Sequence, residues 1–375
     1  MQIPFHKTHT TDEEINAVVG AMKSGWLTMG PKTLEFEKAF KAFIGSSEAI
    51  SVNSATAALH LALKAVGIKR SDEVIVPTNT FVATAEVVTY FDAVPVLCDI
   101  EEDTHNIDVK KIEALITEKT KAIMPVHFGG QACDMDEIYA IAKKYNLKVI
   151  EDAAHAMPSS YKGVKIGNLK GTDVTCFSFY ATKTLSTGEG GMATTNNEIY
   201  AKSMRINRLH GISRDAWDRY TTKGAWYYEI VDNGCKYNTT DINSAIGLVQ
   251  LKKQEILCKK RANIAQKYTT AFKNNNNITL PFVKEDRETS WHLYVIKIDN
   301  RDSVIEQLKE AGVGCSVHFI PIHKHPYYKE RYHYKNEDYP VANAVFEQSL
   351  SLPIYPDMSD EEVAFVIEKV QEIVG

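Results

Sequence analysis

The sequence predicts an α/β protein in which a large domain with a mainly parallel sheet between helices precedes a smaller α+β domain. Between about residues 50 and 200, short apolar runs alternate with helical patterns, as in parallel strands joined by crossover helices. Near residue 240 one long helical pattern replaces this alternation. The length of 375 residues also exceeds a usual single core. We expect a large domain over residues 1–250 and a small one over 251–375.

Four apolar runs in the first part are expected to form strands, namely 73–76, 94–97, 121–126 and 147–150. The helix between the last two is expected to begin at Asp134 as its N-cap, with Glu137 completing a capping box. Its apolar stripe consists of Ile138, Ile141, Ala142 and Tyr145. Ligands of such sheets bind beyond the carboxyl ends of the strands, so functional residues are expected there.

The second part has a different pattern. A long helix is expected over 241–272, followed by a polar loop of four asparagines at 274–277. Later in the chain, strands are expected at 292–298 and 314–319, and helices around 302–311 and 360–373. These elements predict an α+β unit with its own core.

The composition excludes several protein classes. With 44% hydrophobic and 24% charged residues and a net charge of −5, the chain has no basic stripe for nucleic acid. No apolar run approaches the roughly 18 residues of a membrane span. The N-terminus lacks the apolar stretch of a signal peptide, and the six scattered cysteines form no Cys-x-x-Cys pair. We expect a cytoplasmic enzyme with reduced thiols.

Lys183 is the most informative residue of the sequence. It follows an apolar run that begins at Val174, and Ser178 is expected in the same strand; a glycine-rich turn at 188–191 comes next. A lysine at the mouth of a buried strand is poorly hydrated, which lowers its pKa and lets the amine attack an aldehyde. A lone lysine of this kind would more often be an ordinary surface residue.

Two further polar residues follow the strand at 147–150. Asp152 stands next to two alanines that give little steric cover, so its carboxylate is expected to face the ligand crevice. It could hold a protonated pyridine nitrogen, or it could merely cap a helix. His155 could lie beside a ring hydroxyl or pack in the core.

An anion site is predicted at the start of another helix. Ser54 is its expected N-cap, and the small residues Ala55 and Thr56 leave their amides accessible. The hydroxyl of Ser178 could add a further contact. Phe81 begins the next helix and could stack on an aromatic cofactor, although core packing is the commoner role. A reactive lysine, a ring-nitrogen carboxylate, a phosphate site and an aromatic lid together match the needs of pyridoxal phosphate.

These residues resemble the DegT/StrS family of pyridoxal-phosphate aminotransferases, which act on nucleotide-linked keto sugars. The resemblance covers nearly the whole chain and implies a fold-type I aminotransferase. Its motifs lie at 24–31, 53–57, 151–156, 177–183, 188–191, 237–242 and 351–353.

The resemblance also implies roles for individual residues. Lys183 would bind the cofactor aldehyde and carry protons, and Asp152 would hold the ring nitrogen. His155 would lie by the ring hydroxyl, and Phe81 would stack on the ring. The phosphate would be held by Ala55, Thr56 and Ser178. The family usually reaches the neighbouring subunit's phosphate with an asparagine in a Gly-x-Asn segment, where this chain has Lys236. Lys236 or Asn238 would then serve a homodimer with shared active sites.

The implied reaction moves the amino group of L-glutamate, which leaves as 2-oxoglutarate, to a nucleotide-linked keto sugar for surface polysaccharide or glycoconjugate synthesis. Similar Gly-Trp-Leu/Ile-Thr and Tyr-Tyr-x-Glu-Arg segments in members acting on UDP-linked 4-keto pentoses favour carbon 4. Substrate contacts are expected from Trp26, Thr28, His323 and Tyr328. The segment 217–228 is assigned to the nucleotide diphosphate. No metal is expected, because the spacing of His318, His323 and His325 fits no standard site.

Three other functions stay open at this point. A 3-keto sugar or an inosose could be the acceptor, and a non-catalytic regulator would need the same cofactor-binding residues. Members of the family that act as dehydratases carry histidine in place of the lysine, so Lys183 argues against that activity.

Overall fold

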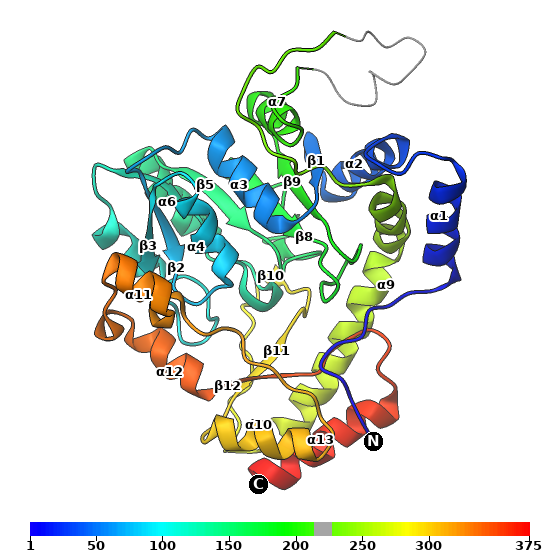
Figure 1. The fold of residues 1–375 in the computed structure, drawn as a ribbon. Coiled ribbons are helices and arrows are strands. Elements are labelled where there is room, and N and C mark those ends of the chain that lie inside the picture. The colour runs from blue at the N-terminus through cyan, green and yellow to red at the C-terminus, as the bar shows by residue number, and fades with distance from the viewer. Residues whose placement is uncertain (214–226) are drawn as a thin grey trace.

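A seven-stranded β-sheet forms the centre of the larger part of the molecule (Figure 1). The computed structural model describes residues 1–213 and 227–375. In spatial order the strands are β1 (Glu48–Val52), β9 (Gly191–Thr195), β8 (Val174–Ser178), β5 (Lys148–Asp152), β4 (Thr120–Ile123), β2 (Glu73–Pro77) and β3 (Val94–Cys98). Only β9 runs antiparallel to its neighbours. The mainly parallel sheet and its four predicted strands are confirmed.

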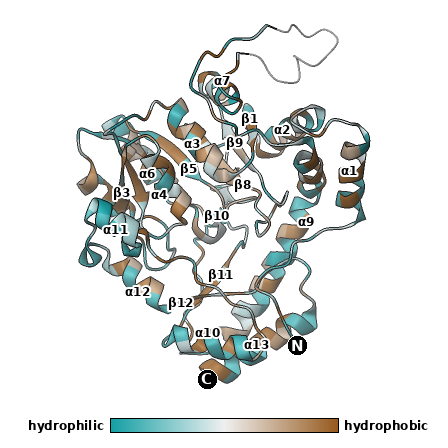
Figure 2. Ribbon diagram, in the orientation of Figure 1, coloured by the Kyte–Doolittle hydropathy of each residue, from teal (hydrophilic) through white to brown (hydrophobic). Residues whose placement is uncertain are grey.

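Helices cover both faces of this sheet, which explains why nearly every residue of its strands is buried. In β2, Val74 and Val76 pack with the helices of one face, whereas Ile75 packs with those of the other. Figure 2 shows the strands as mainly hydrophobic and the outer surface of α11 as hydrophilic. One face is covered by α3 (Ala55–Ala65), α4 (Val82–Thr89), α7 (Glu198–Asn207), α11 (Pro326–Tyr332) and α12 (Pro340–Gln348). The other is covered by α2 (Pro31–Ile44), α6 (Met135–Tyr145) and the first part of α9 (Asp241–Phe272).

A separate core lies at the lower end of the molecule in Figure 1. It joins the second half of α9 to a two-stranded sheet and two helices. These elements are β11 (Tyr294–Lys297), β12 (Ser349–Leu352), α10 (Arg301–Glu310) and α13 (Asp360–Val374). The predicted long helix, its asparagine loop and the last two helices are confirmed. Since α9 runs from one core to the other through residue 250, the predicted domain boundary there stays a prediction.

The remaining elements are short or peripheral. They are α1 (Asp12–Lys23), α5 (Val109–Ile112), β6 (Ser160–Tyr161), β7 (Val164–Lys165), β10 (Arg287–Glu288) and four 3₁₀ turns at Glu113–Leu115, Phe128–Gly130, Ile322–Lys324 and Asn336–Asp338. Within residues 1–213 and 227–375, no helix combines the length and low polarity needed to cross a lipid bilayer.

The predicted strand at 314–319 does not form. Only Ser316 pairs there, as an isolated bridge to Ser351 of β12. Beyond it the chain leaves the small sheet, and the backbone N–H of Phe319 donates to Oδ1 of Asn79 at the end of β2 (3.2 Å). The apolar run therefore connects the two cores instead of extending a sheet.

The predicted capping box of α6 is also wrong. Asp134 occupies the N-cap position but makes no side-chain cap. Its carboxylate instead pairs with Lys284 (2.5 Å) and Arg287 (3.0 Å), which come from a distant segment. Two cations outcompete a backbone amide for this carboxylate.

Candidate active site

Lys183 lies in the turn that follows β8, whose last residue is Ser178. The prediction that both residues share one strand is wrong. After Ser178 the backbone N–H of Phe179 still donates to Gly190 O (2.9 Å), and the chain then folds back so that Lys183 N donates to Tyr180 O (2.9 Å). The lysine thus projects from a turn beyond the carboxyl end of the sheet, where ligands of this architecture bind.

Two opposing effects act on the Lys183 amine. Protein atoms surround it closely enough that burial lowers its pKa to about 8, while the Asp152 carboxylate acts in the raising direction. The amine lies 3.4 Å from Nε2 of His292. A lysine with such a pKa has a larger neutral fraction at physiological pH than an exposed one, and the neutral amine is the nucleophile.

Asp152 ends β5 and is held by two donors. Its Oδ2 accepts a hydrogen bond from Thr84 Oγ1 (2.7 Å), and its Oδ1 accepts one from the backbone N–H of Ala154 (3.1 Å). Burial raises its pKa above the ordinary value, against the effect of these donors and of Lys183. The carboxylate is therefore fixed in orientation and close to a cation, without a salt bridge of its own in the described chain.

His155 is buried next to these residues. Its Nδ1 accepts a hydrogen bond from the backbone N–H of Gly129 (3.3 Å), which leaves the ring proton on Nε2. Its ring stacks on Phe319 with centroids 5.7 Å apart. Burial and the charge of Lys183 lower its pKa well below the usual value, so the imidazole is neutral.

The start of α3 has the geometry expected of the predicted anion site. The amides of Ala55 and Thr56 at this helix start are called the α3 cradle below. Ser54 caps α3 by accepting from Ala57 N (3.1 Å), which leaves the amides of Ala55 and Thr56 without partners inside the helix. Gly191 pairs with Ser178 across β8 and β9, and a Cβ on Gly191 would come within 2.5 Å of the Ser54 carbonyl. The absence of that Cβ allows the start of α3 to lie against the end of β8.

Phe81 immediately precedes α4, as predicted, and is not a core residue. Its side chain is 58% exposed, and its ring lies 5.9 Å from that of Phe319. Since Phe319 also stacks on His155, the three rings form a continuous aromatic surface beside Lys183 and Asp152.

Lys236 and Asn238 lie at the edge of the α3 cradle in this chain. Lys236 Nζ donates to Asn238 Oδ1 (2.5 Å), and Tyr237 between them accepts from the backbone N–H of Asn53 through its carbonyl (2.8 Å). Their expected contact with a neighbouring subunit's phosphate stays a prediction.

The four residues expected to contact substrate do not lie together. Trp26 donates to Met29 O (3.1 Å) in the loop between α1 and α2, which also contains Thr28. His323 and Tyr328 are buried where α11 meets the sheet, and His323 bonds Thr78 (2.7 Å) and Asn343 (3.0 Å). Residues 217–226 of the predicted diphosphate segment lie outside the described residues. No group of three or more metal-ligating side chains is found among the residues that the structure describes.

Several residues near Lys183 were not predicted from the sequence to lie beside it. They are His6, which bonds Ala181 O (3.0 Å), and Thr84, Arg261, His292 and His318. Thr84 is a buried polar residue on α4, but that helix also contains Glu86 and Thr89, so its sequence does not single Thr84 out. The histidines come from the N-terminus and from the loops around the small core, so only the fold brings them to the lysine.

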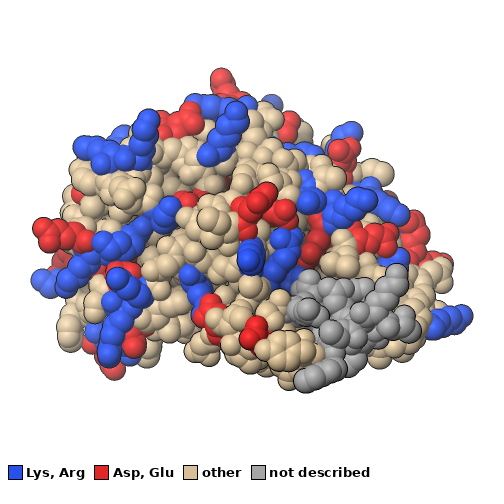
Figure 3. All heavy atoms as spheres, turned by 90° about the horizontal axis from the view of Figure 1, so that it is seen from above, with Lys and Arg blue, Asp and Glu red and all other residues tan. Residues whose placement is uncertain are grey.

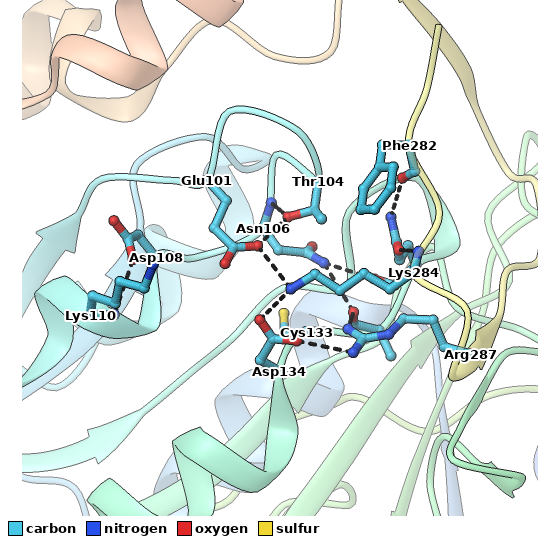
Figure 4. Close-up of polar contacts among 12 residues, drawn as sticks. Glu101, Thr104, Asn106, Asp108, Lys110, Cys133, Asp134, Phe282, Lys284 and Arg287 are labelled. Atoms are coloured by element: carbon cyan, nitrogen blue, oxygen red, sulfur yellow. Dashed lines mark hydrogen bonds and ion pairs between the residues drawn. The ribbon is translucent and has the colours of Figure 1, made fainter.

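A polar network anchors the segment that leads to His292 (Figure 4). Lys284 reaches Asp134 and Glu101 (3.4 Å), and Arg287 donates to Ala132 O (2.7 Å) as well as to Asp134. Gln131 adds two contacts, donating to Phe282 O and accepting from Lys284 N (2.8 Å each). The segment 282–287 is thus fixed to the loops at the carboxyl edge of the large sheet.

The face seen from above shows acidic and basic side chains interspersed, without a stripe of one sign (Figure 3). Among comparisons with known proteins, the sequence model of the DegT/DnrJ/EryC1/StrS aminotransferase family matches residues 8–371. The chain belongs to this family.

Individual relatives match over almost their full length. The uncharacterized protein MJ1066 of Methanocaldococcus jannaschii is 53% identical over 370 residues, which cover 97% of this chain and 95% of that protein. The spore coat polysaccharide biosynthesis protein SpsC of Bacillus subtilis is 49% identical over 379 residues, covering 99% and 97%. The putative sugar aminotransferase Spr1654 of Streptococcus pneumoniae, solved in PLP and PMP forms, superposes with a TM-score of 0.93 at 35% identity; its PLP form is covered to 99% and this chain to 100%.

The protein is accordingly an aminotransferase of fold-type I that depends on pyridoxal phosphate. The residues around Lys183 fit that cofactor. A buried amine, a fixed carboxylate and two helix-start amides beside a strand hydroxyl all lie at the carboxyl edge of one sheet.

Proposed function

We propose that the protein transfers the amino group of L-glutamate to the 4-keto group of a nucleotide-linked sugar, in the synthesis of a surface polysaccharide or glycoconjugate. The 49% identity with SpsC, whose name refers to spore coat polysaccharide, supports the biosynthetic role. The name of Spr1654 supports a sugar as the acceptor. The Gly25-Trp26-Leu27-Thr28 segment, similar to that of members acting on UDP-linked 4-keto pentoses, supports carbon 4.

The observation that carries the proposal is the buried Lys183 amine with the fixed carboxylate of Asp152 nearby. Burial lowers the pKa of the amine, and the carboxylate acts in the raising direction. Bound pyridoxal phosphate supplies the electron sink that amino transfer requires. Lys183 would bind the cofactor and would then move protons between the cofactor and sugar carbons. Asp152, held by Thr84 and the Ala154 amide, would keep a proton on the ring nitrogen.

The remaining roles follow the same geometry. Ala55 and Thr56 would donate backbone N–H groups to the phosphate, and Ser178 would add its hydroxyl. His155 would offer its Nε2–H to the ring hydroxyl, and the exposed ring of Phe81 would cover the cofactor. Beyond one chain, a second copy would bring Lys236 or Asn238 to the phosphate, giving a homodimer. Trp26, Thr28, His323 and Tyr328 would contact the sugar nucleotide.

The test is a substrate panel. Purified holoenzyme with L-glutamate would be incubated with 4-keto and 3-keto nucleotide sugars and with an inosose, and products would be identified by mass spectrometry and NMR. Amination of a 4-keto nucleotide sugar is expected. Amination only of the 3-keto sugars would overturn the position, and amination only of the inosose would overturn the nucleotide-sugar class.

A further inference from the structure

His292 is held firmly in the position where it meets the lysine. Two residues before it, Ser290 Oγ donates to His155 O (2.6 Å). Directly after it, Leu293 N donates to Gly129 O (3.4 Å). The backbone on both sides is therefore tied to the loops that hold His155, and the network of Figure 4 fixes the preceding residues.

The two ring nitrogens of His292 have different surroundings. Nε2 lies 3.4 Å from Nζ of Lys183, whereas Nδ1 is buried and has no hydrogen-bond partner within the described ranges 1–213 and 227–375. Buried N–H groups without an acceptor are rare in proteins, whereas acceptors with an unused lone pair are more common. The ring proton accordingly belongs on Nε2, directed at the lysine.

The imidazole carries only that one proton. Burial lowers the pKa of His292 well below its usual value, and the positive charges of Lys183 and Arg261 and the neighbouring His155 and His318 act in the same direction. Asp152 is the carboxylate that faces Lys183, and it is bonded to Thr84 and Ala154. A neutral Nε2–H group beside an amine can donate only to the lone pair of the uncharged amine.

We propose that His292 is a positioning residue that donates its Nε2–H to Nζ of Lys183 whenever that amine is free, orienting the lone pair and favouring the uncharged form. This inference rests on the proposed role of Lys183. In amino transfer the lysine amine is free while the cofactor carries the amino group. An amine held uncharged at that stage is ready to take up a proton, whereas an ammonium is not.

The direct test is the position of the ring proton. Full-length protein in its PMP form, with ¹⁵N-labelled histidine, would be examined by NMR, and His292→Gln would assign the signal. The expected spectrum shows a proton on Nε2, with a ring signal that moves when Lys183→Ala removes the partner. A proton on Nδ1, or a signal indifferent to Lys183→Ala, would overturn the proposal. Failure of the Lys183 assignment itself would appear separately, as cofactor attached to another lysine.

A kinetic test separates positioning from packing. The amide nitrogen of Gln reaches the place of Nε2, whereas that of Asn reaches only the place of Nδ1. His292→Asn is expected to lower kcat roughly five- to tenfold at unchanged KM, which is the effect of one lost hydrogen bond. His292→Gln is expected to retain most of the original kcat. His105→Asn is the matched control, a buried histidine of neutral charge with no contact to Lys183.

Three outcomes would contradict the positioning role. They are a His292→Gln variant as slow as His292→Asn, an equal loss of kcat in His105→Asn, and a defect carried by KM alone. Each would mean that His292 acts through packing or substrate binding.

Discussion

At the residue scale, the chemistry of Lys183 depends on a competition between burial and charge. Burial disfavours the ammonium and Asp152 favours it, and the pKa of about 8 shows that burial has the larger effect. The opposite shift at Asp152 has the same cause, since burial penalises its charge as well. Both groups are therefore tuned by the same closely packed edge of the sheet.

A pH dependence of cofactor addition follows. Because the pKa is lowered, the neutral amine forms above about pH 8 rather than above 10.5. The neutral fraction should rise from about a tenth at pH 7 to about nine tenths at pH 9. The rate at which pyridoxal phosphate adds to the apoenzyme, followed by the visible absorbance, should rise about tenfold over this range and then level off. A rate still climbing at pH 10 would contradict the lowered pKa.

The sequence could predict Lys183, Asp152, His155 and the start of α3, because each lies beside a strand or helix signal of its own. It could not predict His292, which lies 109 residues from Lys183 and reaches it only through the docking of the segment after β10. The proposed roles of Lys236 and Asn238 would depend on a second chain, so a single sequence has no local pattern that decides between them.

At the element scale, the start of α3 approaches β9 so closely that a side chain at Gly191 has no room. Gly191→Ala would place a Cβ 2.5 Å from the Ser54 carbonyl and 2.7 Å from Ala55 N, and backbone atoms cannot yield as a flexible side chain can. We expect a loss of about 1–3 kcal/mol in the free energy of unfolding and weaker cofactor binding, measured by urea unfolding and by cofactor titration.

Gly20→Ala in α1 is the matched control. A Cβ there meets nothing within 4 Å, and alanine favours the helix by roughly 0.5–1 kcal/mol. Unchanged cofactor affinity in both variants would contradict the assignment of the cradle.

The ion pairs of Asp134 give a second prediction at this scale. Asp134→Ala would remove a carboxylate from Lys284 and from the buried Arg287, leaving Arg287 with Asp286 as its remaining acidic partner. We expect the free energy of unfolding, measured by thermal or urea unfolding, to fall by about 2 kcal/mol. Glu137→Gln is the control, because the exposed Glu137 makes no cap, and a change below about 0.5 kcal/mol is expected. Equal losses of stability in the two variants would contradict this account and favour a capping box between Asp134 and Glu137.

The elements that the sequence predicted were those with a long or purely apolar pattern, such as α9 and β2. The edge strand β1 and the antiparallel strand β9 were not predicted, because their threonines, serine and alanines resemble the composition of loops. The run at 314–319 differs from its predicted strand because only Ser316 bridges to β12, Cys315 packs against the small core and Phe319 bonds Asn79.

At the scale of the whole molecule, α9 joins the two cores (Figure 1). Lys183, from the large part, meets His292, which precedes β11 of the small sheet (3.4 Å). The proposed homodimer can be tested by complementation. Protomers with Lys183→Ala would be co-expressed with protomers carrying both Lys236→Ala and Asn238→Ala. If these residues act across subunits, the mixed dimer has one intact site and regains up to half of the activity per dimer. No recovery in an isolated mixed dimer would place their action within one chain.

The central claim is that Lys183 is the residue that binds pyridoxal phosphate. Borohydride reduction of the holoenzyme, followed by proteolysis and mass spectrometry, locates the attached cofactor directly. The cofactor mass is expected on the peptide that contains Lys183, and Lys183→Ala should lose both this mass and the visible absorbance. Attachment to any other lysine, or persistence of the absorbance in Lys183→Ala, would contradict the account.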